Sequence, residues 1–174
     1  MGAGFDVIAL VSLAQIDPQA VEALLDRAFG ADRRQRTAYR VRSGTTAIPE
    51  LSFAAVLEDG ALAGTIQCWP VALTCDSGES VAMVMVGPVA VEPALQQSGI
   101  GRVLTERMLE AAGGQPLMLI GDPEYYERFF GFAAARTGQW RLPGAFEPRR
   151  LLARGDSVPD CAGMVGPRLL QIAV

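Results

Sequence analysis

Stretches of apolar residues alternate with polar or glycine-rich turns along the 174 residues of this chain. Residues 5–11 form a short apolar run that predicts a first strand. The pair Asp17-Pro18 predicts a helix start, because Asp caps free amides and Pro fits the first helical turn. Apolar residues at helical spacing then lead to Gly30, where the helix is expected to end. A second, surface helix is expected over residues 33–42, as a solvated arginine face or as the wall of a substrate or phosphate site.

Three apolar stretches follow and predict an antiparallel meander of strands. The stretches and the turn signals between them are residues 51–57, 58–60, 61–73, 77–79 and 80–91. The third stretch is almost entirely apolar, as expected for a strand buried on both faces. Gly87-Pro88 interrupts this stretch, and proline cannot donate a hydrogen bond to a neighbouring strand. The pair therefore predicts a bulge or a local splaying.

The pattern then changes to helix, strand and helix. An amphipathic helix follows the strand at 80–91, ends at Gly113-Gly114 and leads into a buried strand at 116–121. A strand-helix-strand unit of this kind implies parallel pairing of its two strands. Asp122-Pro123 caps a short helix over residues 124–130, and Gly131-Phe132 opens an extended region that continues through Leu142.

These elements define the expected fold class: an α/β (α+β) domain with a mixed, mostly antiparallel sheet flanked by helices. At this length the chain is most simply a single domain over residues 1–174. Its core is expected over residues 5–142, with residues 143–174 as a C-terminal extension that packs on that core.

Composition and charge narrow the class of protein. Half of the residues are hydrophobic, a fifth are charged and the net charge is −4, which gives no support to nucleic-acid binding. No apolar run reaches the length of a bilayer span and no signal pattern is present, so a cytoplasmic protein without a membrane partner is expected. The cysteines at 68, 75 and 161 have no metal-ligand spacing and are expected to be buried or incidental thiols in a reducing compartment.

The absent residue types exclude several chemistries. All 15 basic residues are arginine, and the chain has no lysine and no histidine. Without histidine, Ser-His-Asp and Cys-His nucleophilic catalysis are excluded. Without lysine, the phosphate-binding P-loop and Schiff-base catalysis are excluded as well.

The segment from Val89 to Arg102 carries the clearest chemical signal. An apolar strand runs into a loop with the pattern Gln96-x-x-Gly99-x-Gly101, and a helix follows at once. The free amides at a helix N-terminus bind anions with the help of the helix dipole, and glycines let an anion approach the backbone closely. A dinucleotide fingerprint would need a third glycine, which is absent. The loop is therefore expected to bind a phosphate group.

This loop resembles the acyl-CoA signature of the GNAT-type N-acetyltransferases. The segment from Gly121 to Phe132, with its Tyr125-Tyr126 pair before Gly131, resembles the second motif of that family and its YhbS-like branch. The resemblance covers residues 5–142 in element order. It implies acetyl-CoA as the donor and a splayed parallel strand pair that forms the acyl-CoA cleft.

The resemblance also implies which residues bind CoA. Val89 and Val91 match the positions that offer backbone groups to the pantetheine arm, and Arg102 either contacts a phosphate or is an exposed first-turn residue. The full set of expected CoA-binding residues is Val89, Ala90, Val91, Gln96, Gln97, Ser98, Gly99, Ile100, Gly101, Arg102 and Phe129.

The residues that transfer protons are less completely defined by the sequence than the residues that bind CoA. The family uses a tyrosine to protonate the departing thiolate; Tyr126 is the expected acid and Tyr125 the alternative, because the sequence has one extra residue between Tyr126 and Gly131. A phenol is protonated at neutral pH and can donate. Residues 81–85 are apolar where some relatives carry a base, so the amine proton leaves through water or through Glu50 or Glu79.

The function expected from these observations is an acetyl-CoA-dependent N-acetyltransferase. It would transfer acetyl directly to an amine of a small molecule or peptide, as a monomer or homodimer. The alternative is a non-catalytic acyl-CoA-binding sensor or regulatory module.

Overall fold

The computed structural model of the protein describes residues 7–169. Its helices and strands are, in chain order, β1 (Ile8–Ser12), α1 (Pro18–Phe29), α2 (Thr37–Val41), β2 (Phe53–Leu57), β3 (Leu62–Cys75), β4 (Ser80–Val91), α3 (Ile100–Ala112), β5 (Leu117–Ile120), α4 (Pro123–Phe130), β6 (Trp140–Arg141), β7 (Leu151–Arg154) and β8 (Gly163–Pro167). The helix starts at Pro18 and Pro123 are confirmed, with Asp17 and Asp122 as the caps that accept amide hydrogen bonds. Phe5 and Asp6 of the expected first strand lie outside the described residues.

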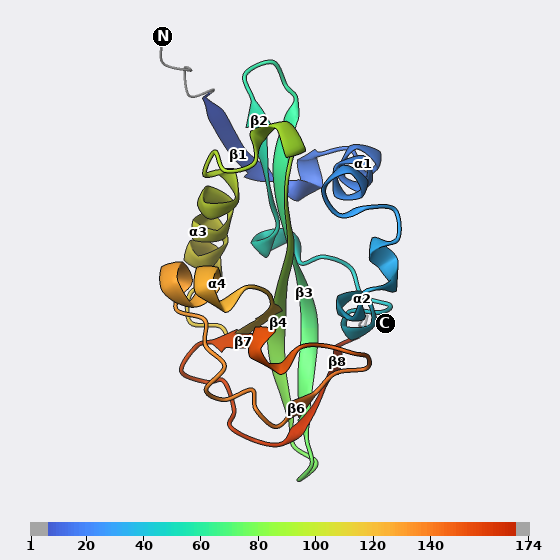
Figure 1. Ribbon diagram of the computed structural model, residues 1–174, viewed down its shortest axis with the longest axis vertical. Helices are drawn as coiled ribbons and strands as arrows, with labels where there is room; N and C mark the ends of the chain where they lie inside the picture. Colours follow the sequence, from blue (N-terminus) through green and yellow to red (C-terminus); the bar gives the residue numbers. More distant parts are fainter. Residues whose placement is uncertain (1–6, 170–174) are drawn as a thin grey trace, which may run out of the picture. The chain divides into compact units, whose positions relative to one another are not determined.

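The strands form a mixed sheet in the order β1-β2-β3-β4-β5-β7, with β8 paired to β3 and β6 paired to β8 (Figure 1). Pairing is antiparallel for β1–β2, β2–β3, β3–β8 and β5–β7. The pairs β4–β5 and β6–β8 are parallel. This arrangement confirms the expected fold class, and the β4–β5 pair confirms the parallel pairing inferred from the strand-helix-strand order.

The described chain divides into two compact units. Unit 1 contains residues 7–33, 49–67 and 88–112, and unit 2 contains residues 34–48, 68–87 and 113–169. Strands β3 and β4 each contribute one part to unit 1 and the other part to unit 2. The expectation of a single domain stays a prediction.

Unit 1 is built from the N-terminal strands and helices α1 and α3. One side of α1 buries Val21, Leu24 and Leu25 in an apolar cluster that includes Ala90 of β4. Helix α3 packs on β2, and the guanidinium of Arg107 lies 4.6 Å from the ring centre of Phe53. The helical spacing in the sequence thus directs the apolar side of each helix toward the strands of this unit.

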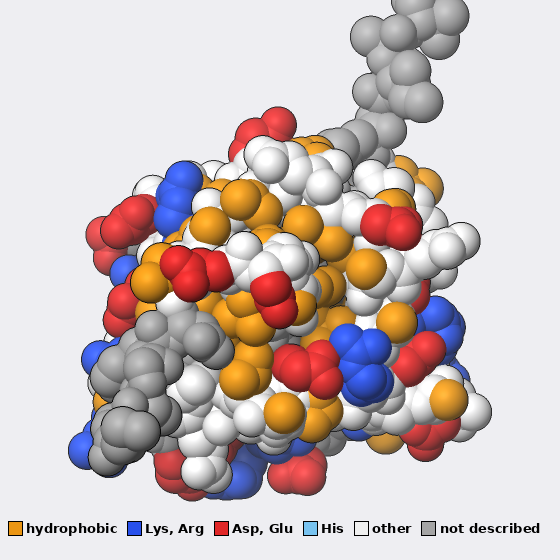
Figure 2. All heavy atoms as spheres, turned by 90° about the horizontal axis from the view of Figure 1, so that it is seen from above, with side chains coloured by type: hydrophobic (Ala, Val, Ile, Leu, Met, Phe, Trp, Pro, Cys, Tyr) orange, Lys and Arg blue, Asp and Glu red, His pale blue; other side chains and the backbone are white. Residues whose placement is uncertain are grey.

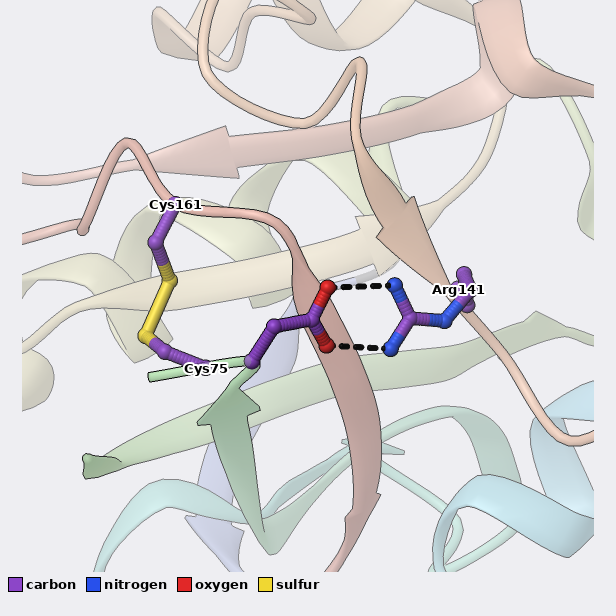
Figure 3. Close-up of a disulfide and its surroundings, with 4 residues drawn as sticks. Cys75, Arg141 and Cys161 are labelled. Atoms are coloured by element: carbon purple, nitrogen blue, oxygen red, sulfur yellow. Dashed lines mark hydrogen bonds and ion pairs between the residues drawn. A yellow bond between two sulfur atoms is a disulfide. The ribbon is translucent and has the colours of Figure 1, made fainter. Parts of the chain in front are cut away.

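Unit 2 has the larger apolar core and contains a disulfide. Cys75, the last residue of β3, is bonded to Cys161, while Cys68 is a buried thiol. Beside the disulfide, Arg141 donates two hydrogen bonds to the carboxylate of Asp76 (Figure 3), and these bonds hold the pKa of that carboxyl below its usual value. The expectation that the cysteines are incidental thiols is therefore wrong for Cys75 and Cys161. Their separation of 86 residues left no local signal in the sequence.

The structure differs from the expected continuous helix over residues 33–42 and, at two positions, from the expected solvated arginine face. Residues 33–42 form a 3-10 turn, η2 (Arg33–Gln35), and the separate helix α2. Neither flanking arginine lies on a solvated face: Arg33 is buried in ion pairs with Glu22 and Asp26, and Arg42 is buried with its guanidinium between two aromatic rings. Ion pairing and ring stacking allow these arginines to be buried, which a count of charges does not reveal.

The C-terminal part of the chain is also more regular than expected. Strand β7 pairs with β5 over four residues, and β8 pairs with β3 over five. The region expected to be extended after Gly131 contains only an isolated bridge at Ala133 and the two residues of β6. Residues 143–169 thus contribute two strands to the sheet and core residues to unit 2, such as Leu151 and Val165.

The described surface carries charges of both signs. Figure 2 shows acidic and arginine side chains scattered around hydrophobic ones on the face that it presents. Within residues 7–169, no helix has the length and apolar character that crossing a bilayer requires.

Candidate functional site

The glycine-containing loop of unit 1 connects β4 to α3 and is exposed. A short 3-10 turn, η4 (Pro93–Leu95), comes first, and residues 96–99 then lie at the surface. Two residues of the loop have left-handed backbones, Gln97 at φ 69° and Gly99 at φ 90°. The amide and hydroxyl of Ser98 both donate to the carbonyl of Leu95, which fixes the turn.

The first-turn amides of helix α3 precede its hydrogen-bond ladder. The helical ladder starts where the Val103 amide donates to the Gly99 carbonyl at 3.0 Å. The amides of Ile100, Gly101 and Arg102 precede that bond, so they lie outside the ladder of the helix. Gly99 has no side chain that could cap them, and a Cβ at this position would meet nothing within 4 Å. Open space therefore lies beside a helix N-terminus, which is the arrangement that binds phosphate groups.

The end of β4 lies directly against this helix start. A Cβ added to Gly101 would be 3.6 Å from Val91 and 3.7 Å from Val89. These two valines are partly buried and face α3, whereas Ala90 is fully buried on the other face among the side chains of α1. The structure thus brings the expected CoA-binding residues 89–91 and 96–102 together in unit 1.

The side chain of Arg102 is directed along the helix. Its Nε donates to Glu106 at 3.2 Å, and both side chains are about half exposed, at 53% and 54%. An exposed pair four residues apart on a helix contributes little to stability. Breaking this pair to let Arg102 contact a phosphate would therefore cost little free energy. The expected contact between Arg102 and a phosphate stays a prediction.

The parallel pairing between β4 and β5 is short. Within the described residues it joins Val84 to Leu117 and Met85 to Met118. Strand β4 continues to Val91, whereas β5 ends at Ile120. Gly87, just past the paired segment, has φ 119°, a conformation that L-residues rarely adopt. The sequence predicts a bulge or a local splaying at Gly87-Pro88, and within the described residues the pairing of β4 with β5 ends at Met85, just before this pair.

Helix α4 of unit 2 holds both candidate acids. The Gly131 amide donates to the carbonyls of Tyr126 and Glu127, and the left-handed Gly131 ends the helix. The Tyr126 ring packs against Tyr125, Phe130 and Phe132, with ring centres 5.0 to 6.2 Å apart. The extra residue before Gly131 is thus taken up within a regular helix.

Gly121 makes room for the Tyr126 ring. A Cβ at Gly121 would lie 2.7 Å from the Cε2 atom of that ring, closer than real contacts allow. Loss of water around the ring raises the pKa of Tyr126 to about 12, so the phenol keeps its proton throughout the neutral range. Sequence reasoning did not assign this role to Gly121; its place directly before the Asp-Pro helix start was the available signal.

The remaining candidate residues, Phe129, Glu50 and Glu79, are more exposed than Tyr126. Phe129 is 41% exposed and packs against Tyr125 and Phe130. Of the two carboxylates considered as a base, Glu50 lies in the 3-10 turn η3 (Pro49–Leu51) and Glu79 in the β3–β4 turn, and both are exposed. Their exposure alone does not favour either as the base.

Comparisons with known proteins agree with this geometry. The sequence model described as "Acetyltransferase (GNAT) domain" matches residues 12–135. The chain therefore belongs to the GNAT acetyltransferase family, which confirms the family expected from the two motifs. No curated protein matched the chain.

Solved structures share the fold. A GNAT family N-acetyltransferase from Escherichia coli (YhbS), solved in complex with CoA, has a TM-score of 0.69 and 24% identity over 94% of this chain and 89% of its own. A GNAT family acetyltransferase from Brucella melitensis, solved with acetyl-CoA, has a TM-score of 0.60 and 24% identity, with 94% and 97% covered. A GCN5-related N-acetyltransferase from Kribbella flavida has a TM-score of 0.55 and 22% identity, with 76% and 34% covered.

Proposed function

We propose that this protein uses acetyl-CoA to acetylate an amine of a small molecule or a peptide. The observation that carries the proposal is the helix start at α3, where an exposed loop and a glycine with open space beside it precede the first turn of the helix. Family membership adds the reaction class, and the relatives solved with CoA and acetyl-CoA support the donor.

The residues of unit 1 fit the phosphate end of such a donor. The amides of Ile100, Gly101 and Arg102 would bond a pyrophosphate, with the positive end of the α3 dipole beside it. Gly101, in the first turn of α3, lies beside the side chains of Val89 and Val91 at the end of β4. The backbone of β4 would hold the pantetheine arm of the donor. When bound, acetyl-CoA supplies an activated thioester.

Tyr126 is the residue of unit 2 to which we assign the acid role. Its phenol would donate the proton that the CoA sulfur needs when the carbon–sulfur bond breaks. A pKa of about 12 keeps the phenol protonated throughout the neutral range. Tyr125 shares the helix and is the backup for this role.

A non-catalytic sensor that binds acyl-CoA is the second candidate. The apolar residues at 81–85 favour it, because they include no group that could take the amine proton. Thermal unfolding with CoA, acetyl-CoA and NAD tests both candidates: no stabilisation by either CoA species contradicts both. Thiol release with amines then separates them, since only the enzyme turns acetyl-CoA over faster when an amine is present.

A further inference from the structure

The indole of Trp69 on β3 holds a backbone group of the neighbouring strand β4. Its Nε1 atom donates to the Gly87 carbonyl at 2.7 Å, and the ring is partly buried against the core of unit 2. Burial raises the pKa of the Cys68 thiol to about 12, and a hydrogen bond from the Gly87 amide to this thiol opposes part of the rise. Neighbouring side chains on a strand point to opposite faces, so Gly87 is held from both faces of the sheet.

Strand β4 has one residue more than β3 along their shared ladder. Near the hairpin, the Cys75 amide donates to the Glu79 carbonyl at 2.7 Å. At the far end, the Glu92 amide donates to the Ala63 carbonyl at 2.8 Å. Each such bond marks two residues that lie opposite each other, so twelve residue steps of β3 face thirteen of β4. This difference defines a β-bulge in β4, and Gly87 lies in this stretch with a φ of 119°, which suits a glycine.

The bulge lies where β4 leaves β5. Within the described residues, the parallel pairing of the two strands ends at Met85. The same register, if continued, would set Gly87 level with Ile120, the last residue of β5. The next residue, Gly121, lies against the ring of Tyr126, since a Cβ there would be 2.7 Å from that ring. The two strands thus separate at the level of the residue to which we assign the acid role.

A stacked arginine fixes the plane of the Trp69 ring. The guanidinium carbon of Arg42 is 3.8 Å from the ring centre of Trp69 and 4.0 Å from that of Tyr39 in α2. Arg42 is 6% exposed, and a guanidinium shielded from water attracts aromatic faces more strongly than an exposed one. The indole has a single N–H donor, which lies in the ring plane. The stack therefore directs this donor at the Gly87 carbonyl.

We propose that Trp69 is a positioning residue for acetyl transfer: its indole N–H holds the Gly87 carbonyl and so keeps the β4 bulge in the conformation that separates β4 from β5. This inference rests on the proposed use of acetyl-CoA. Without the bond, the peptide after Gly87 can turn back into the sheet, and the gap narrows where the thioester would meet Tyr126. A misplaced thioester reacts more slowly even when it is bound equally well. Trp69 thus acts through the backbone of β4.

The test compares Trp69→Phe with Trp140→Phe, its matched control. Both variants keep an aromatic ring and lose one indole N–H and the same volume. Trp140 is the other tryptophan of the chain, lies in the same unit and is 3% exposed, and among residues 7–169 its Nε1 atom has no hydrogen-bond partner. Gly87→Ala tests the bulge itself, because its φ strains an L-residue although a Cβ there would meet nothing within 4 Å.

The rate assay measures thiol release from acetyl-CoA with benzylamine, butylamine and glycinamide. We expect kcat to fall about tenfold in Trp69→Phe, as the loss of one hydrogen bond implies, with KM for acetyl-CoA and calorimetric CoA affinity close to wild type. Trp140→Phe should keep the wild-type kcat. Gly87→Ala should lower kcat to a similar extent, and adding Trp69→Phe to it should lower kcat little further, because both changes act on one peptide.

Hydrogen–deuterium exchange reports on the bulge without any acceptor. The amides of residues 84–91 should exchange faster in Trp69→Phe than in wild type, because the bond that holds this stretch of β4 is lost. Trp140→Phe should leave their exchange unchanged.

Two results would overturn the inference. One is a Trp69→Phe protein with the kcat of wild type. The other is exchange at residues 84–91 that is equal in the two tryptophan variants, which would mean that any loss of rate comes from altered packing. Failure of the proposed function looks different, because the wild-type protein itself would then bind no CoA or release no thiol with any amine, and the positioning role would fall with it.

Discussion

At the scale of single residues, the proposed chemistry depends on the surroundings of Tyr126. Its ring packs among aromatic side chains of unit 2 and against the bare backbone of Gly121. The resemblance to the GNAT family implied a tyrosine acid, but the extra residue before Gly131 left its register open. The contact with Gly121 depends on how the chain turns into α4, which residue types alone do not specify.

Removing the phenol of Tyr126 tests the acid role. We expect Tyr126→Phe to lower kcat by about a hundredfold or more, the usual size of a general-acid contribution, with CoA affinity nearly kept. Steady-state thiol release and calorimetry measure the two quantities. Tyr125→Phe is the matched control and should keep most of the rate. A full rate in Tyr126→Phe would move the acid to Tyr125 or to solvent.

Gly121→Ala tests the same contact without touching the phenol. The added methyl would lie 2.7 Å from the ring, so the ring must move. We expect kcat to fall while CoA affinity is kept, and near-ultraviolet circular dichroism to report the displaced ring. Gly138→Ala in the same unit is the control, because a Cβ there would meet nothing within 4 Å. Equal kinetics in both variants would contradict this role of Gly121.

The raised pKa of Tyr126 also predicts how stability depends on pH. Folding raises this pKa from 10.0 to about 12, mainly by burial, so the folded state holds the proton more tightly than the unfolded chain. The resulting stabilisation is complete below pH 10 and is lost as pH rises toward 12. Urea unfolding at pH 9, 10 and 11 should show a steeper loss in wild type than in Tyr126→Phe. Parallel curves would show that burial does not raise this pKa.

At the scale of elements, the central feature is the loop between β4 and α3. The sequence predicted it well because its signals are local: an apolar strand, glycines in a short loop and a helical pattern directly after. The elements that escaped prediction depend on distant partners. Strands β7 and β8 are short and gain their order from pairing with β5 and β3. In the arginine-rich segment at 33–42, Arg33 is buried in ion pairs with Glu22 and Asp26 of α1.

Glycines at the two ends of α3 allow a matched test of the loop. Gly99 has φ 90° and Gly113 has φ 57°, both conformations that strain an L-residue. Replacing either by alanine should cost about 1 kcal/mol of unfolding free energy. Only Gly99→Ala should also weaken CoA binding, because it displaces the amides of the first turn. Calorimetric titration with CoA measures this, and equal affinities in the two variants would contradict the role of the loop.

At the scale of the whole molecule, the disulfide between Cys75 and Cys161 is the least expected feature. It joins the end of β3 to the segment before β8 and closes a loop of 86 residues. A cross-link over such a distance stabilises mainly by restricting the unfolded chain, by up to about 4 kcal/mol. The sequence offered only an odd number of cysteines, and which two of them meet depends on the pairing of β8 with β3.

Loss of this disulfide should lower the melting temperature. We expect the Cys75→Ser, Cys161→Ser double variant to melt roughly 5 to 15 °C below the oxidised wild type. Reductant should lower the wild type toward the variant and leave the variant unchanged, which controls for the serine substitutions. A thiol count after denaturation without reductant should find one free cysteine, Cys68. Three reactive thiols would contradict the disulfide.

The most direct test of the account measures acetyl transfer itself. Purified protein is incubated with acetyl-CoA and the primary amines benzylamine, butylamine and glycinamide, and both CoA thiol and N-acetylated product are quantified. We expect thiol and acetylated amine to form in equal amounts, at a rate that rises with amine concentration and falls in Tyr126→Phe. Thiol release that is no faster with any amine than without one would contradict the proposed N-acetyltransferase.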